Sequence, residues 1–168
     1  MNEQLLRQCG DKIEVLYQRR RMVSAVAAWQ RLREELSLIS GTEAEQQFLI
    51  AAEIAAHCRR QGWAVWEAGV GASSITLFLL ELSLADPIEN RLPFERYFFP
   101  DRGETVDLLL KTLDRYAEPL EQMIAKAGAT SWIRLGNTDP LEAVPFLVEQ
   151  DLRHQGKEPL LMGRCFPV

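Results

Sequence analysis

A short loop at residues 68–74 carries the residue types that most directly suggest chemistry in this chain. It combines Gly69 and Gly71 with the hydroxyls of Ser73 and Ser74, directly before an apolar run. Glycines let backbone N–H groups approach a ligand closely, and the N-terminus of a helix favours anions. The loop therefore predicts a phosphate site. Glycines between a strand and a helix also serve tight packing, and serines suit helix capping, so both interpretations stay open.

A second candidate is the acidic residue Asp107, which lies in the apolar segment 105–110. This segment predicts a strand, and alternation along a strand places Asp107, Leu109 and Lys111 on one face. This face offers one carboxylate, one apolar side chain and one ammonium group. On the residues alone, Asp107 is a candidate for a salt bridge with Lys111 or an arginine.

The histidines and cysteines do not form a recognisable metal or disulfide pattern. His57 and His154 lack carboxylate or cysteine neighbours at the spacing of metal ligands, and Cys9, Cys58 and Cys165 are odd in number and widely separated. The pattern predicts neither a zinc site nor a disulfide framework. We expect reduced thiols in a cytoplasmic protein.

The overall charge limits the kind of partner. The 168 residues have a formal net charge of −5, which argues against the broad basic surface of a non-specific nucleic-acid binder. Contact with a nucleotide or DNA would have to use a local patch. No apolar run approaches the roughly 18 residues of a membrane span, so no membrane partner is expected.

Periodicity and turn residues predict one domain, residues 1–168, with a helical lead-in over 1–60 and a sheet with helices over 61–168. The fold class is α/β (α+β). Thr42 and Glu45 suggest a capping box for the third helix, which Gly62 ends. The expected helices are 3–19, 22–39, 43–61, 75–82 and 114–126 with another from 139, and the expected strands are 63–66, 105–110, 131–136 and 160–165.

The stretch from residue 46 to 102 resembles the palm of the bacterial DNA polymerase III alpha subunits, the C-family replicative polymerases. Five pieces carry the resemblance in the family's order and at nearly its spacing. They are Gln61-Gly62, the loop 69–74, Asp86-Pro87, Phe94-Glu95-Arg96-Tyr97 and Pro100-Asp101-Arg102. A looser likeness extends over residues 3–150.

The resemblance implies a nucleotidyltransferase-like fold in which Gly69, Gly71, Ser73, Ser74, Arg96 and Arg102 face the triphosphate. It also implies a strand with three metal-binding acids, of which only Asp107 remains in this sequence. The arginine of the family's glycine-rich loop is also absent. Phosphoryl transfer depends on paired metals, so we expect a catalytically inactive relative.

Three hypotheses follow. The first is an inactive palm-like protein with a binding or accessory role in DNA replication or repair, whose partner is a nucleotide, DNA or a replication or repair protein. The second is a nucleotidyltransferase whose reduced Mg²⁺ site uses Asp107 with Asp101 or Glu104. The third is a structural protein-interaction module. The sequence does not determine the oligomeric state.

Overall fold

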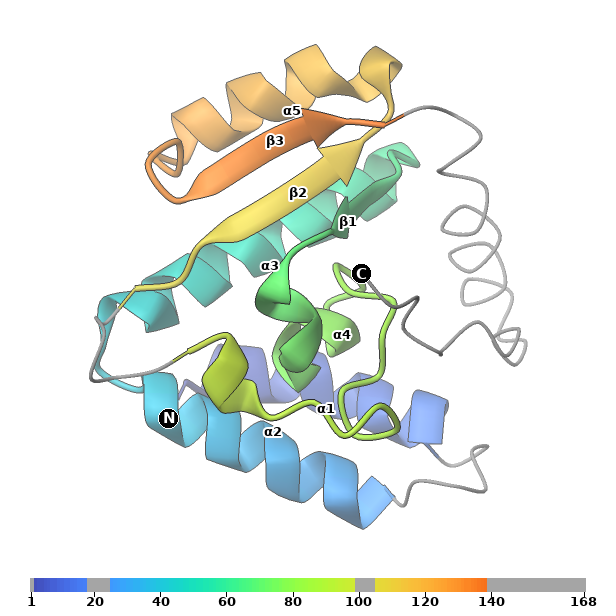
Figure 1. Ribbon diagram of the computed structural model, residues 1–168, viewed down its shortest axis with the longest axis vertical. Coiled ribbons are helices and arrows are strands. Elements are labelled where there is room, and N and C mark those ends of the chain that lie inside the picture. The colour runs from blue at the N-terminus through green and yellow to red at the C-terminus, as the bar shows by residue number, and fades with distance from the viewer. Residues whose placement is uncertain (1, 18–24, 99–104, 139–168) are drawn as a thin grey trace.

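The computed structural model describes residues 2–17, 25–98 and 105–138, and it is a mixed helical and stranded fold (Figure 1). The α/β (α+β) class expected from the sequence is confirmed. The elements are α1 (Glu3–Tyr17), α2 (Ala25–Ile39), α3 (Glu43–Gln61), β1 (Val65–Glu67), η1 (Val70–Ser73), α4 (Ile75–Leu79), η2 (Phe94–Arg96), β2 (Leu108–Thr112), α5 (Asp114–Lys126) and β3 (Ile133–Asn137).

The first two helices form a pair at one end of the molecule, and the sheet with α5 lies at the other end, with α3 between them (Figure 1). Apolar residues recur at helical spacing, which gives each helix one buried stripe. On α1 the stripe is Leu5, Cys9, Ile13 and Tyr17, and on α2 it is Ala28, Leu32, Leu36 and Ile39. Gly10 is needed where the helices meet, because a Cβ there would collide with the ring of Trp29.

Helix α3 begins and ends close to the expected residues, but its first turn is capped differently. Thr42 makes no side-chain cap and instead donates from Oγ1 to the carbonyl of Ile39 at 2.7 Å. The Glu45 carboxylate accepts from Gly41 N–H at 2.8 Å. The expected capping box is therefore replaced by contacts to the preceding turn. Gly62 ends the helix with a φ of 67°, as a left-handed glycine commonly does.

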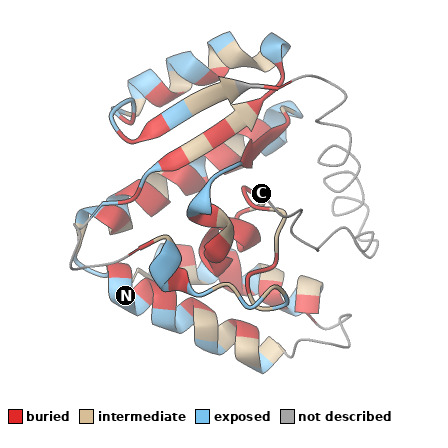
Figure 2. Ribbon diagram, in the orientation of Figure 1, coloured by how far each residue is buried: buried red, intermediate tan, exposed pale blue. Residues whose placement is uncertain are grey.

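The sheet has three strands in the order β1-β2-β3, with β1 antiparallel and β3 parallel to β2. Leu108, Leu110 and Ile133 are buried on one face. Leu109 and Lys111 are half-buried on the other, and Leu109 pairs with the exposed Arg134. Figure 2 shows how the buried positions gather between the sheet and the helices.

The apolar run 75–82 forms a shorter helix than expected, because α4 ends at Leu79. Glu81 adopts a left-handed φ of 65°, which breaks the helix. The Glu81 carboxylate pairs with Lys12 and, at 3.2 Å, with Arg59. The next residue, Leu82, then accepts a hydrogen bond from Glu67 N–H at 2.6 Å, which ties the chain back to β1.

The helix expected from residue 139 and the strand expected at 160–165 lie outside the described residues. Within the described ranges no helix is both long and apolar enough to cross a bilayer. Trp66 and Trp132 are buried, and Trp29 and Trp63 are partly buried.

Candidate functional site

The glycine-rich loop lies between β1 and α4 and rests on the second strand. Ala68 N–H donates to the carbonyl of Leu109 at 2.8 Å. A Cβ on Gly69 would lie 3.6 Å from the Cβ of Leu109. The loop and the strand face that carries Leu109 are therefore in contact, and the apolar side chain of Leu109 lies at the point of contact.

A buried carboxylate occupies the hollow of this loop. Glu67, the last residue of β1, is only 6% exposed, and its Oε1 accepts a hydrogen bond from Gly69 N–H at 2.7 Å. A Cβ on Gly71 would lie 2.7 Å from the Cδ of Glu67. The two glycines therefore leave room for an acid of the chain itself, so the space expected for a phosphate is already filled.

The environment of Glu67 works against its charge. Burial raises the pKa of the carboxyl above its usual value, while the backbone N–H groups of Gly69, Gly71, Leu109 and Ala72 lower that pKa in part. Oε2 is buried, and none of the residues that the structure describes makes a hydrogen bond to it. A buried carboxyl group with a raised pKa and only one hydrogen-bonded oxygen is a perturbed group of the kind found at functional sites.

A second buried acid, Glu35 of α2, fills the N-terminal end of α4. Its carboxylate accepts hydrogen bonds from Ile75 N–H at 2.9 Å, from Thr76 N–H at 3.2 Å and from Ser74 Oγ at 2.9 Å. The acidic side chain thus satisfies donors that the first turn of a helix would otherwise leave open. Burial raises the pKa of Glu35, and these hydrogen bonds together with Arg31 lower it in part.

Arg31 holds Glu35 from the opposite side. Its Nε donates to Glu35 Oε1 at 3.0 Å, and its Nη2 donates to the carbonyls of Ser73 and Leu92 at 3.3 and 3.1 Å. The guanidinium also lies over the Phe94 ring, 5.8 Å from its centroid. This arginine therefore joins α2, the glycine-rich loop and the start of η2 in one network.

The two serines expected to hold phosphate or cap a helix are both buried. Ser74 is the N-cap of α4, since its hydroxyl accepts from Leu77 N–H at 3.2 Å and donates to Glu35. Ser73 contributes its backbone carbonyl to Arg31. The structure therefore gives the capping role to Ser74.

Tyr97 lies directly after η2, among several acidic residues. Its hydroxyl is buried, and no described residue makes a hydrogen bond to it. Burial raises the pKa of Tyr97 well above its usual value, and the charges of Glu67, Asp107 and Glu35 raise it further. Acids of β1, of α2 and of the segment before β2 therefore all act on this tyrosine.

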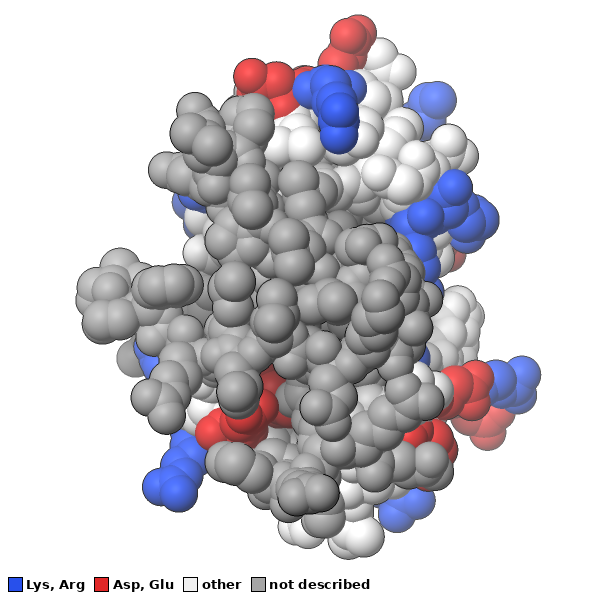
Figure 3. Space-filling view, turned by 90° about the vertical axis from the view of Figure 1, so that its right-hand side faces the viewer, with Lys and Arg blue, Asp and Glu red and all other residues white. Residues whose placement is uncertain are grey.

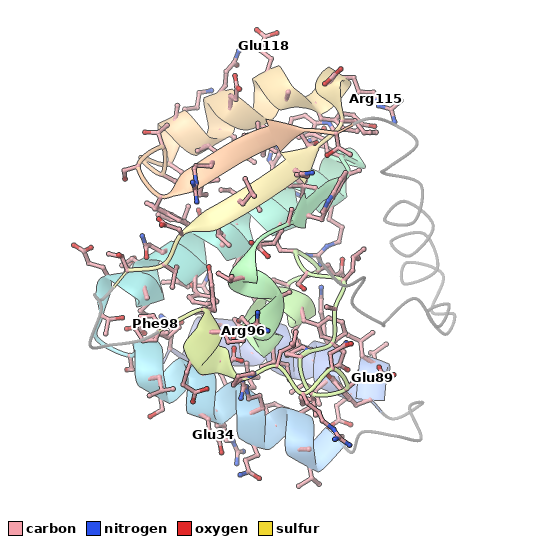
Figure 4. The ribbon with its side chains drawn as sticks, viewed as in Figure 1. Glu34, Glu89, Arg96, Phe98, Arg115 and Glu118 are labelled. Atoms are coloured by element: carbon pink, nitrogen blue, oxygen red, sulfur yellow. The ribbon has the colours of Figure 1, made fainter. Side chains whose placement is uncertain are left out.

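The remaining expected site residues are dispersed. Asp107 is exposed and lies directly before β2, and neither it nor Lys111 forms an ion pair within the described residues. Arg96 is exposed on η2, without an ion pair to Glu95, and Figure 4 shows it in front of the α4 region. Arg102, Asp101 and Glu104 lie outside the described residues.

Residues 2–17, 25–98 and 105–138 contain no group of three or more acidic, histidine or cysteine side chains arranged to hold a metal ion. In place of the expected acids, the strand face offers Leu109 and Lys111 beside Asp107. Cys9 and Cys58 are buried free thiols, and burial raises the pKa of each to about 12. Where Figure 3 is not grey, basic and acidic side chains are interspersed, without one large basic field.

Glu35, Glu67 and Tyr97 are the residues that sequence reasoning missed. Glu67 had a usable signal, because an acid at the end of an apolar strand and immediately before a glycine-rich loop must find donors when it is buried. Glu35 gave only a weak signal, an acid among apolar helix positions. Tyr97 had none beyond its place beside Arg96.

Comparisons with known proteins place the chain in a family. The family model of the bacterial DNA polymerase III alpha NTPase domain matches residues 3–130. The error-prone DNA polymerase of Nocardia farcinica is 29% identical over 102 residues, which is 60% of this chain and 9% of that protein.

Two further relatives are also error-prone DNA polymerases. The protein of Alkalilimnicola ehrlichii is 35% identical over 74 residues, 44% of this chain and 7% of its own length. The protein of Bordetella parapertussis is 32% identical over 87 residues, 52% of this chain and 8% of its own length. The chain thus spans less than a tenth of the relatives that it matches, and by the extent of the family match it belongs to the bacterial DNA polymerase III alpha family.

Proposed function

We propose that this chain is a palm-like member of the polymerase III alpha family that does not transfer nucleotides and that has a binding or accessory role in DNA replication or repair. Residues 1–168 then act as one cytoplasmic domain. Its partner is a DNA phosphate backbone, a nucleotide or a replication or repair protein, reached through a local patch around Arg96 and Arg102.

The observation that carries the proposal is the Glu67 carboxylate in the hollow of the glycine-rich loop. A triphosphate would need the space and the backbone donors of the loop, and the Glu67 side chain fills that space and occupies the Gly69 N–H. The hydrogen bond to Gly69 and the fit against Gly71 support this role for Glu67.

The strand face beside the loop supports the same conclusion. Two-metal catalysis needs carboxylates that hold the ions against the attacking and leaving oxygens. Here Asp107 is exposed, Leu109 is apolar, and Lys111 adds a positive charge that would repel a divalent ion. These residues could not assemble a paired-metal centre by themselves.

Arg96 supports the binding role. It is exposed, and within the described residues it has no ion pair that would neutralise it. Such a cation can contact a phosphate without first giving up an internal partner. The neighbouring Tyr97 is packed against Phe48 and Phe94, which fixes the backbone that presents Arg96.

Primer extension and DNA binding test the two halves of the proposal. The purified chain is incubated with a labelled primer–template and deoxynucleotides, with Mg²⁺ or Mn²⁺, and no extension is expected. Fluorescence anisotropy with the same DNA is expected to show salt-sensitive binding that Arg96→Ala weakens severalfold, because a phosphate contact is lost. Arg33→Ala, an exposed arginine on α2, is the matched control.

Extension of the primer by the chain would overturn the inactive role and favour a nucleotidyltransferase with a reduced Mg²⁺ site. DNA affinity that Arg96→Ala leaves unchanged would overturn the phosphate-binding patch. That second result would favour a structural interaction module.

A further inference from the structure

An arginine at residue 91 is held in a backbone conformation that L residues rarely adopt. Within the described ranges only Glu81 and Arg91 are non-glycine residues with a positive φ, at 65° and 54°. The side chain of Glu81 is fixed by Lys12 and Arg59. Arg91 is exposed and has no partner of this kind among the described residues, so its own contacts do not explain the strain.

The turn around Arg91 is rigid. Asp86 Oδ1 accepts from Ile88 N–H at 2.9 Å, and the carbonyl of Asp86 accepts from Asn90 N–H at 3.0 Å. Arg91 N–H donates to the carbonyl of Ile88 at 3.1 Å, and Leu92 N–H donates to that of Pro87 at 2.8 Å. These hydrogen bonds impose the left-handed conformation and fix the position from which Arg91 projects.

Arg91 lines a pocket of about 250 Å³ between this turn and the first half of α2. Arg31 also lines it, and the other walls are Ala27, Ile88, Leu92 and two prolines, Pro87 and Pro93. No acidic residue is among the lining residues, although the exposed Glu89, labelled in Figure 4, lies two positions before Arg91. The pocket therefore combines an apolar wall with two guanidinium groups.

Arg31 is held in place and still has donors to offer. Its hydrogen bonds use Nε and Nη2, toward Glu35 and two backbone carbonyls, so Nη1 has no partner within the described residues. A guanidinium whose orientation is fixed loses little entropy when it binds a planar anion. Arg31 is thus preorganised, and Arg91 is the exposed second cation.

We propose that this pocket binds a carboxylate carried on a small apolar group. Guanidinium groups bind planar carboxylates through paired hydrogen bonds, and the proline, isoleucine and leucine walls match an apolar stem. A fully hydrated phosphate would satisfy the arginines but would leave the apolar walls without a partner. Both a free organic acid and the C-terminal residue of a peptide have this chemistry.

This site is separate from the glycine-rich loop. It is lined by Arg91 and Arg31, and neither Glu67 nor a glycine of the loop is among its lining residues. The outcome of a ligand test here therefore does not depend on whether the chain transfers nucleotides.

The test titrates the full chain with benzoate and with the neutral benzamide, and follows backbone amide chemical shifts by NMR. A second arm uses acetyl-Leu-Leu with a free carboxylate and the same peptide as an amide, and a third uses inorganic phosphate. Benzoate or the free peptide acid is expected to shift the signals of residues 87–93, and the one that binds more tightly identifies the source. The neutral analogues and phosphate are expected to bind at least tenfold more weakly.

Arg91→Gly separates the fold from the site, because glycine accepts a positive φ without strain. The variant is expected to keep or raise the melting temperature and to weaken carboxylate binding at least tenfold. Arg33→Ala, outside the pocket, is expected to leave binding unchanged. Equal binding by Arg91→Gly, by the neutral analogues or by phosphate would overturn the proposal, as would the absence of any shift with both acids.

Discussion

The carboxylate of Glu67 accepts a hydrogen bond from the backbone N–H of Gly69 at 2.7 Å, across the mouth of the glycine-rich loop. The acid and the loop belong to one continuous stretch of chain, so the contact is local. It joins the end of β1 to the start of η1 and leaves the loop with a carboxyl side chain of its own in the hollow.

The first prediction concerns the pH dependence of stability. Burial raises the pKa of Glu67 above its usual value of 4.5, so between that value and the raised pKa the native state binds more protons than the unfolded chain. The contribution of Glu67 to the free energy of unfolding is therefore full below pH 4.5 and is lost as the pH rises through the raised pKa.

The variant Glu67→Gln has no titratable group at this position. Its free energy of unfolding minus that of the wild type is therefore expected to increase as the pH rises from 4.5 through the raised pKa of Glu67. Urea unfolding at several pH values measures the difference. Glu53→Gln, an exposed acid on α3, is the control and should follow the wild type. A constant difference between Glu67→Gln and the wild type would show that Glu67 does not titrate as described.

The second prediction concerns the buried acid Glu35. Glu35→Ala leaves the partly buried Arg31 without its carboxylate and leaves the first N–H groups of α4 without an acceptor. Breaking a buried pair in this way costs about 3–5 kcal/mol of stability. Chemical denaturation measures this loss, and Glu34→Ala at the exposed neighbouring position should change stability by less than about 0.5 kcal/mol. Comparable losses in the two variants would contradict the network.

The third prediction restores the acidic strand face. Leu109→Asp together with Lys111→Asp places two carboxylates on the same face as Asp107, next to the loop. The double variant is expected to bind Mn²⁺, measured by electron paramagnetic resonance, whereas the wild type should bind none specifically. Leu109→Asn with Lys111→Asn is the matched control for the change in polarity. Equal Mn²⁺ binding by the control and the acidic variant would argue against the carboxylate face.

The fourth prediction concerns close packing between the first two helices. Gly10→Ala would drive a methyl group into the Trp29 ring, so it should destabilise the fold by about 1–3 kcal/mol. Thermal unfolding measures the effect. Gln8→Ala, at an exposed position on α1, serves as the control. An unchanged melting temperature for Gly10→Ala would mean that α1 and α2 can move apart enough to accept the methyl group without loss of stability.

Much of the fold could be predicted from local patterns. The stripes Leu5, Cys9, Ile13 and Leu32, Leu36, Ile39 mark α1 and α2 because helical periodicity depends on sequence alone. The early end of α4 could not be predicted, since it depends on Glu81, whose conformation is secured by Lys12 and Arg59 from distant helices.

Part of the candidate site could likewise be predicted from the sequence, and part could not. The loop and its glycines were visible in the sequence, as was the loss of carboxylates at Leu109 and Lys111. The occupation of the loop by Glu67 and of α4 by Glu35 was not, because a pattern that predicts donors does not reveal which acceptor in the folded chain will meet them.

Isothermal titration calorimetry of a deoxynucleoside triphosphate with Mg²⁺ into the wild-type chain tests the central claim most directly. Because Glu67 occupies the loop and the strand face lacks paired acids, no binding at the loop is expected for the wild type, and any heat from a contact at Arg96 should be lost in Arg96→Ala. The same titration with Glu67→Ala should show weak binding of the triphosphate through the vacated loop amides. If the wild type instead bound one triphosphate saturably and as tightly as Glu67→Ala does, Glu67 would not block the loop.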